Sequence, residues 1–529
     1  MKKLVALLAA AAILAASCKN KEKAFEVQPR DTSIVVQNSF STLFFDSTQL
    51  ETFMTGETLN DSLTARIRSF YNSRNFQYAW FDSTGLAEQA HSFLNMQSQY
   101  ISYARDSSVY NAKLGQLLDS IGSRPDTLAY QVPGKDRLGY ELLLTEYFFR
   151  YAVKAYQGDN QLDAQGLGWF IPRKKLDLSA VLDSMIGKKG ATAYEPVNRQ
   201  YNLLKTELLK YYAIEKEGKW DSIRMDKPVY KPGESGEAIR QVKQRLTLTG
   251  DLSATDTTAL FDTALVSAVK HFQKRYGLKQ DGAIGKNLLK ELNRPIQERI
   301  RQLLINMERL RWVSAELPAD YLLVNIPAYT LYVYESGQLN WTMNVVVGAV
   351  AHNTVIFQGD MKYVVFAPYW NVPPSIIKNE IMPGIKRNPN YLAQKNMEWN
   401  GGNVRQKPGP GNSLGLVKFL FPNTYNIYLH DTPSKSLFGE TNRAFSHGCI
   451  RLSEPKKMAE YLLRNDSTWT ADKIGAAMNS GKEKYVTLKK TVPVFIGYFT
   501  AWVGSDGDLN FRDDIYGHDK KMAAKMFTN

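Results

Sequence analysis

The sequence predicts a multidomain α+β protein with a helical domain, a small three-helix module, and a β-rich domain that carries an insert. Three observations support this fold class. Apolar residues recur at helical spacing through residues 45–227, glycines divide residues 228–294 into short helices, and from residue 318 the apolar pattern changes to a period of two. A length of 529 residues fits two to four domains.

The N-terminus predicts a bacterial signal peptide over residues 1–18. Lys2 and Lys3 precede an apolar stretch that is short for a bilayer span, and the stretch ends at Cys18. The ending Ala-Ala-Ser-Cys resembles a lipoprotein cleavage box. We therefore expect Cys18 to carry a lipid that anchors the protein to a membrane facing the periplasm, with residues 19–44 as a polar tether. The alternative is an ordinary cleaved signal in which Cys18 has no role.

The region 45–227 is predicted to be mostly helical, and its aromatic-rich run 70–80 is expected to pack in a core. One helical face carries Leu63, Ile67, Phe70 and Tyr71. Residues 228–294 predict three short helices with a glycine-rich connector at 277–285, and residues 295–317 predict a connecting helix. The alternative for 228–294 is a generic helical spacer.

Alternating apolar and polar residues define a β-rich domain at 318–490. The predicted strands include 323–327, 330–334, 341–347 and 361–366, with a turn at Gly337. Charge, glycine and proline interrupt the pattern at 376–412, which we interpret as an insert that caps a site; a loop without a gating role is the alternative. Residues 491–529 form a C-terminal segment.

The net charge of +14 indicates an anionic partner or a basic surface that serves only solubility. The chain shows no compact Lys/Arg run, zinc-ligand spacing or RNA-binding signature, so nucleic acid is not expected. A cell-wall polymer that bears carboxylates fits the same charge.

One cysteine, Cys449, lies outside the leader, in the run 446–451 that reads Ser-His-Gly-Cys-Ile-Arg. A single thiol with histidines nearby is a candidate nucleophile, because an imidazole or backbone N–H groups raise its thiolate fraction. His430 ends a predicted strand at 425–430 and lies 19 positions before Cys449, so the two residues must come from neighbouring elements. The alternative is a small buried cysteine without chemistry.

This arrangement of His430 and a Ser-His-Gly-Cys run resembles the signature of the L,D-transpeptidases, the cysteine enzymes of the peptidoglycan layer. The runs 369–376, 408–412 and 417–419 are similar to the large multidomain periplasmic members, and the resemblance covers roughly residues 45–510. It implies a scaffold domain at 45–227, a peptidoglycan-binding module at 228–294 and a catalytic domain at 318–490. Arg451 departs from the family's short motif, which often has Asn at this position.

The resemblance implies that Cys449 attacks a peptidoglycan stem tetrapeptide, expels D-Ala and forms a thioester. The side-chain amine of a neighbouring stem then completes a 3→3 cross-link. His430 would be the general base, oriented by the backbone carbonyl of Asp431, with His447 as the rival base. The N–H groups of Gly448 and Cys449 are candidate oxyanion donors.

Five further residues are expected to line the substrate groove. Arg451 is expected to steer a substrate carboxylate, with a structural ion pair as the alternative. The other four, for which packing is the alternative, are Ser446, Tyr369, Trp370 and Asn412. No metal or cofactor is expected. Expected partners are donor and acceptor stem peptides and a membrane reached through the lipid anchor, and a peptidoglycan synthase is a candidate partner.

Three other functions stay open at this point. Water could release the thioester, which would make the protein an L,D-carboxypeptidase. The acyl group could instead pass to a lysine of an envelope protein and anchor that protein to the wall. The third alternative is a non-catalytic, lipid-anchored peptidoglycan-binding protein, which the presence of Cys449, His430 and His447 disfavours.

Overall fold

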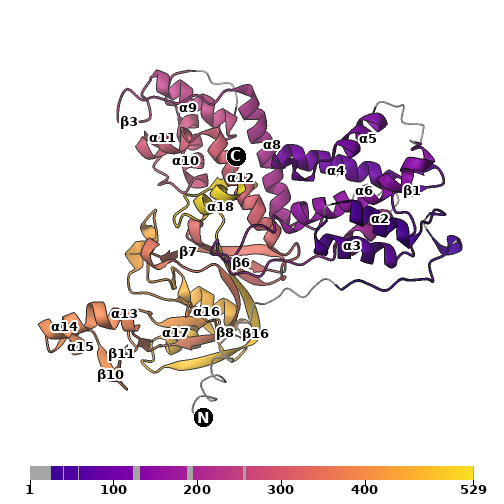
Figure 1. The fold of residues 1–529 in the computed structure, drawn as a ribbon. Helices are drawn as coiled ribbons and strands as arrows, with labels where there is room; N and C mark the ends of the chain where they lie inside the picture. The colour runs from indigo at the N-terminus through magenta and orange to yellow at the C-terminus, as the bar shows by residue number, and fades with distance from the viewer. Residues whose placement is uncertain are drawn as a thin grey trace, which may run out of the picture. The chain divides into compact units, whose positions relative to one another are not determined.

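The computed structural model describes residues 26–39, 41–57, 59–122, 131–187, 195–253 and 258–527 (Figure 1). Contacts group them into two compact units. The first holds residues up to 158 and 175–196, and the second holds 159–174 and 197 onward. The predicted signal peptide, with Cys18, lies outside the described residues. No helix in the described ranges combines the length and apolarity needed to cross a membrane.

The first unit is helical, as the spacing of its apolar residues predicts. Its aromatic residues pack edge to face in the core, including Phe70 against Phe149 and Phe93 against Phe148. A short hairpin, β1 (Phe81–Asp82) and β2 (Gly85–Leu86), precedes α4. The helices are α2 (Ser47–Gly56), α3 (Asp61–Asn72), α4 (Glu88–Ala104), α5 (Ala112–Gly122), α6 (Gly134–Ala152) and α7 (Leu178–Gly187).

The predicted tether is shorter than the range 19–44. Side-chain amides near the end of α3 hold this stretch by its backbone: Asn72 donates to the carbonyl of Gln28, and Asn75 donates to that of Ile34. Phe44 pairs with Gln77 as an isolated bridge. Residues 28–39 and 41–44 therefore belong to the first unit.

Glu141 on α6 is fully buried and accepts three hydrogen bonds. The donors are the backbone N–H groups of Ala79 and Trp80 at 2.6 and 2.9 Å and the Tyr71 hydroxyl at 2.9 Å. Burial raises the pKa of Glu141 to about 7, although these donors oppose the rise. The carboxyl group thus fixes the chain entering β1 onto the helices.

Replacing Glu141 with alanine is expected to destabilise the first unit by about 3–5 kcal/mol, since two buried N–H groups lose their acceptor and a cavity remains. Hydrogen exchange at the amides of Ala79 and Trp80 measures the effect. Glu51→Ala is the matched control, because its ion pair with Arg68 is exposed and its loss should cost less than about 1 kcal/mol. Equal effects of the two substitutions would contradict the assigned role of Glu141.

The helical part of the second unit includes the predicted three-helix module. Residues expected on its inner faces are buried, among them Ile239, Val242, Phe272 and Leu288. The predicted connecting helix is α12, and α8 packs against it, so α8 groups with the second unit. These helices are α8 (Arg199–Glu217), α9 (Glu237–Leu248), α10 (Thr263–Arg275), α11 (Lys286–Leu292) and α12 (Ile296–Trp312).

A nine-stranded sheet follows and closes on itself. Its order is β14-β7-β15-β13-β12-β8-β16-β5-β6, and β6 also pairs with β7. Gly337, in a left-handed conformation, forms the predicted turn between β6 and β7. The strands are β5 (Tyr321–Asn325), β6 (Thr330–Glu335), β7 (Gln338–Gly348), β8 (Phe357–Phe366), β12 (Val417–Leu420), β13 (Leu429–His430), β14 (Ala444–Ser446), β15 (Ile450–Leu452) and β16 (Lys484–Gly497).

Two sequence-based boundaries differ from the structure. β16 crosses the limit placed at 490, because its second half continues the pairing with β8 and also pairs with β5. The strand expected at 425–430 begins only at Leu429. Before it, the Asn423 side chain accepts from the N–H groups of Tyr425 and Ile427 and holds the chain in a turn.

The insert folds around a small core of its own. Val372, Ile376, Ile381 and Val404 are buried together, apart from the core of the sheet. β9 (Trp370–Asn371) and α13 (Pro374–Ile376) lead into the insert, and β9 pairs with β11. The elements of the insert are η6 (Ile377–Ile381), α14 (Met382–Arg387), α15 (Tyr391–Gln394), β10 (Met397–Asn400) and β11 (Asn403–Gln406).

Candidate active site

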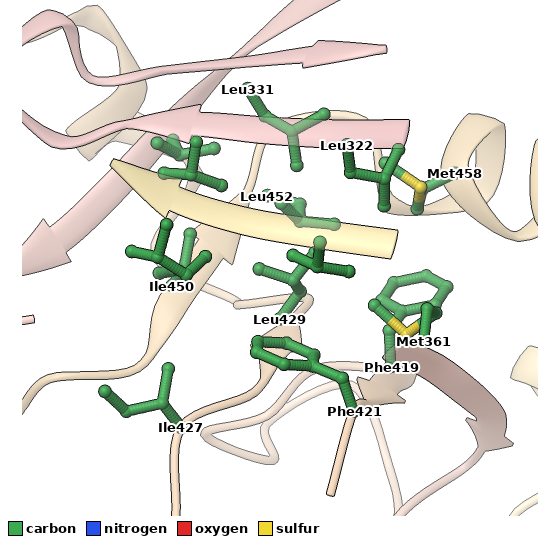
Figure 2. Close-up of a cluster of buried hydrophobic side chains, with 14 of the residues drawn as sticks. Leu322, Leu331, Met361, Phe419, Phe421, Ile427, Leu429, Ile450, Leu452 and Met458 are labelled. Carbon is green, nitrogen blue, oxygen red and sulfur yellow. The ribbon is translucent and has the colours of Figure 1, made fainter. Parts of the chain in front are cut away.

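Two neighbouring strands bring the predicted catalytic residues onto one face. β13 and β15 are parallel, and His430 lies opposite Arg451. Side chains alternate between the faces of a strand, so Cys449, which directly precedes β15 and lies two positions before Arg451, continues the face of His430 and Arg451. The intervening residues point into the core shown in Figure 2: Leu429, Ile450 and Leu452.

The Cys449 thiol is free and partly exposed. Its sulfur lies 3.6 Å from the backbone carbonyl oxygen of Asn426. Burial raises the pKa of the thiol above its usual value, while hydrogen bonds from Tyr428 and the charge of Arg451 act in the opposite direction. In the resting site the sulfur is therefore a protonated thiol at neutral pH.

His430 is 4% exposed, and its Nδ1 lies 2.5 Å from the backbone carbonyl oxygen of Asp431. This is the contact that the sequence predicted. A carbonyl only accepts, so Nδ1 carries the proton and Nε2 keeps its lone pair. Burial, and next the charge of Arg451, lower the pKa of His430 to about 3. The resting pair is therefore a neutral imidazole and a thiol, and not an ion pair.

The carboxylate of Asp431 fixes the chain that leaves β13. It accepts from the N–H groups of Leu416 and Thr432 at 2.9 and 2.7 Å and from Lys435 Nζ at 2.5 Å. Gly415 has a φ of +62°, and a Cβ there would lie 2.3 Å from the Asp431 carboxyl carbon. Asp431 thus acts on His430 through its backbone carbonyl, while its side chain rigidifies the turn.

In the turn before Cys449, two groups that were predicted to serve the reaction, the Ser446 hydroxyl and the Gly448 N–H, bond to the turn itself. Ser446 is buried, and its hydroxyl donates to the carbonyl of Cys449 at 2.5 Å and accepts from the N–H of Gly448 at 3.1 Å. Gly448 has a φ of +111°, which favours glycine. Since its N–H is already bonded, Gly448 is not a free oxyanion donor, and Ser446 holds the turn instead of facing substrate.

A chain of hydrogen bonds through Thr354, Gly348 and Tyr516 also holds this turn. The Thr354 hydroxyl donates to the carbonyl of Gly448 at 2.8 Å and accepts from the N–H of Gly348 at 2.9 Å. Tyr516, in the C-terminal segment, donates to the carbonyl of Gly348 at 2.5 Å. The C-terminal segment therefore helps to position the turn that precedes Cys449.

His447, the rival base, is exposed. Its ring lies 5.0 Å from that of His352, and its Nε2 is 4.0 Å from Glu380 of the insert. Both partners lie outside β13 and β15. The structure therefore favours His430 as the imidazole that serves Cys449.

Tyr428 belongs to the same strand face, and the sequence analysis missed it. Its ring lies 5.7 Å from that of His430, and the Cys449 thiol is near enough to act on its hydroxyl electrostatically. Burial, and next the adjacent Cys449, raise the pKa of Tyr428, so its O–H stays available as a donor. The signal was its position two residues before His430, which alternation places on the same face.

Residues 319–494 match the family model of the L,D-transpeptidase (YkuD) catalytic domain. The chain therefore carries an L,D-transpeptidase domain. Residues 65–208 match a scaffold-domain family, a range that spans both compact units, and residues 235–292 match one described as "Putative peptidoglycan binding domain".

A relative from Haemophilus influenzae, named "Putative L,D-transpeptidase", is 33% identical over 245 residues. These residues cover 42% of this chain and 49% of the relative, so the chain spans about half the length of that protein.

Two solved structures of L,D-transpeptidases are similar to part of this chain. The one from Xylanimonas cellulosilytica is 14% identical and covers 52% of this chain and 100% of its own, with a TM-score of 0.19. The one from Stackebrandtia nassauensis is 16% identical and covers 52% and 98%, with a TM-score of 0.22.

Three residues expected in the groove instead build the base of the insert on the L,D-transpeptidase domain. Asn412 is 1% exposed and donates to the carbonyls of Pro368 and Lys407 at 3.0 and 2.9 Å, so it holds a loop and cannot line a groove. Trp370 packs against the core of the insert. The Tyr369 ring is covered by the guanidinium of Arg405, 4.1 Å away. None of them contacts Cys449 in the described contacts.

Arg451 remains beside the thiol of the L,D-transpeptidase domain. Its Nε is buried without a hydrogen-bond acceptor, and no ion pair of Arg451 is found among the described residues. Burial lowers its pKa, while Cys449 acts in the opposite direction. An unpaired guanidinium next to the Cys449 thiol favours the substrate-carboxylate role over the structural ion pair.

Proposed function

We propose that this protein is a peptidoglycan L,D-transpeptidase that forms 3→3 cross-links through a thioester on Cys449. The observation that supports this most is the common strand face of Cys449, His430, Tyr428 and Arg451. These residues supply a nucleophile, a base with a free Nε2, an oxyanion donor and a site for a carboxylate. The peptidoglycan-binding match at 235–292 supports the substrate class.

In the first step, Nε2 of His430 takes the thiol proton while the sulfur attacks the carbonyl carbon of the third stem residue. The oxyanion accepts hydrogen bonds from the Tyr428 hydroxyl and the Cys449 N–H. The C–N bond to D-Ala then breaks, and the imidazolium of His430 protonates the leaving amine. The products are free D-Ala and an S-acyl Cys449.

Substrate binding makes His430 a stronger base in this scheme. The charge of Arg451 is one of the causes that hold the pKa of His430 near 3. A donor carboxylate that pairs with Arg451 offsets this charge, so the pKa of His430 rises when the donor is bound. The site therefore becomes reactive only with its donor in place.

In the second step, a side-chain amine of a neighbouring stem attacks the thioester, and Cys449 leaves. The insert 376–412 excludes water from this intermediate in our proposal, which favours transfer over hydrolysis. Its Glu380 lies 4.0 Å from His447 of the nucleophile turn, which supports a place for the insert at the site.

The envelope location is part of the proposal. A lipid on Cys18 would anchor the protein to a membrane facing the periplasm, and the net charge of +14 suits a wall polymer that bears carboxylates. A peptidoglycan synthase that supplies new strands is a proposed partner.

Incubation with disaccharide tetrapeptide, followed by intact-protein and product mass spectrometry, tests the function. A thioester adduct together with a dimer that lacks one D-Ala is the expected result. A tripeptide without dimer would indicate L,D-carboxypeptidase activity in place of transfer. Acylated envelope protein would indicate wall anchoring, and unchanged substrate with no adduct would leave only a binding protein.

A further inference from the structure

We infer that Phe170 and Tyr425 form an acceptor subsite, where the cationic side-chain amine of the incoming stem binds before it attacks the thioester. This inference rests on the proposed function and names the surface that selects an amine over water. Both residues are 38% exposed. Their centroids lie 5.6 Å apart at 47°.

Phe170 reaches the site on a segment from the helical region of the sequence. Residues 159–174 group with the second unit, where Trp169 forms a parallel bridge with Ile356. The N–H of Phe170 donates to the carbonyl of Ile356 at 2.9 Å. Trp169 is 2% exposed and packs edge to face on Trp312. The neighbouring residue is thus buried, and Phe170 is rigidly held with an exposed ring.

Tyr425 is held by the turn that precedes β13. The Asn423 side chain binds the N–H of Tyr425 at 3.0 Å, and the Tyr425 ring packs on buried Phe357 with centroids 4.9 Å apart. The next residue, Asn426, has a φ of +56°, and its carbonyl oxygen lies 3.6 Å from the Cys449 sulfur. The aromatic pair therefore adjoins the carbonyl that contacts the nucleophile.

Aromatic faces and a carbonyl oxygen are the groups that bind an ammonium ion. Among the described residues, no Lys or Arg is found over the ring of Phe170 or Tyr425, whereas several other aromatic rings of the chain carry such a cation. Arg451, which suits the donor carboxylate, bears the opposite charge from the amine. Separate groups thus bind the anionic donor and the cationic acceptor.

The chemical step that follows is balanced. The bound ammonium loses one proton to water, and the amine nitrogen attacks the thioester carbonyl carbon. A C–N bond forms and the C–S bond to Cys449 breaks. The second proton of the nitrogen passes through His430 to the departing sulfur, which restores the thiol.

Binding of an acceptor tripeptide to the full chain tests the subsite without requiring any turnover. Two probes are compared, one with a free side-chain amine and one acetylated at that nitrogen, each with lysine or diaminopimelate as its third residue. Wild-type protein is expected to bind the free amine more tightly. Phe170→Leu and Tyr425→Leu should each weaken that binding about tenfold and leave the acetylated probe unaffected.

Tyr425→Phe should retain the binding of wild type, since it keeps the aromatic face. Tyr485→Leu is the matched control, because Tyr485 is an exposed aromatic residue of the same domain, on β16. In the cross-linking assay, the Phe170 and Tyr425 leucine variants should form thioester at the wild-type rate but yield about tenfold less dimer relative to tripeptide.

Equal binding of both probes, or equal loss of both in the leucine variants, would overturn the subsite. A slower thioester formation in these variants would also overturn it, since the rings would then serve the donor. Failure of the proposed function gives a different result, because wild-type protein would then form no thioester. The comparison of the two probes still tests the subsite in that case.

Discussion

Cys449→Ala is expected to abolish covalent labelling by a carbapenem and the release of D-Ala from tetrapeptide, with a loss of at least about 1,000-fold. The reason is that the proposed reaction passes through a bond to this sulfur, and no other described residue on the face of β13 and β15 is a nucleophile of comparable strength at neutral pH. Intact-mass spectrometry after carbapenem exposure measures the adduct, and chromatography measures D-Ala.

The chain offers a matched control for this substitution. Its other cysteine is Cys18, so Cys18→Ala should keep full labelling and full release of D-Ala. The Cys449 side chain is only partly buried, and the backbone of its turn is held by Ser446 and Thr354, so alanine at position 449 should leave the fold intact. A carbapenem adduct that persists in Cys449→Ala would refute the assigned nucleophile.

Much of the site could be predicted because it depends on local patterns. The distance in sequence between His430 and Cys449 required two adjacent elements, and the structure places His430 in β13 and Cys449 directly before the parallel neighbour β15. The contact of His430 with the carbonyl of Asp431 was also predictable, since only a single peptide unit separates the two groups. The change of apolar period at residue 318 marked the start of the β-rich domain for the same local reason.

Other residues were misjudged because their partners are distant or internal. Nothing in the sequence shows that the Ser446 hydroxyl accepts a hydrogen bond from the N–H of Gly448. Nor does it show that the Asn412 side chain donates to the carbonyls of Pro368 and Lys407. Polar side chains in a motif are assigned to substrate by default, whereas burial forces them to satisfy backbone groups first. The same principle explains why Asn72 and Asn75 hold residues that the sequence presented as a free tether.

Long-range pairing also set boundaries that composition could not. The segment 159–174 lies within the helical part of the sequence, yet its Trp169 pairs with Ile356 of the second unit. β16 continues past residue 490 because β5, more than 150 residues earlier in the chain, pairs with its second half. Period and turn signals describe a segment by itself and therefore cannot report the element that it joins.

The two histidines near the thiol should respond very differently to substitution. His430→Gln is expected to slow thioester formation by about 10²–10⁴-fold at pH 7, because it removes the general base while glutamine keeps the volume. His447→Gln should slow it by less than about tenfold, since His447 is exposed and interacts with His352 and Glu380. Stopped-flow acylation by a carbapenem measures both rates.

The dependence of the acylation rate on pH separates a missing base from a damaged fold. The pKa of His430 is lowered to about 3 and that of Cys449 is raised, so between these values the wild type holds a neutral base and a thiol, and its rate should change little with pH. In His430→Gln only the thiolate can react, and its fraction rises tenfold per pH unit below the thiol pKa. The variant should therefore recover steeply as the pH rises, whereas His447→Gln should keep the shallow profile of the wild type. The opposite pattern, a steep profile in His447→Gln and a shallow one in His430→Gln, would transfer the role of base to His447.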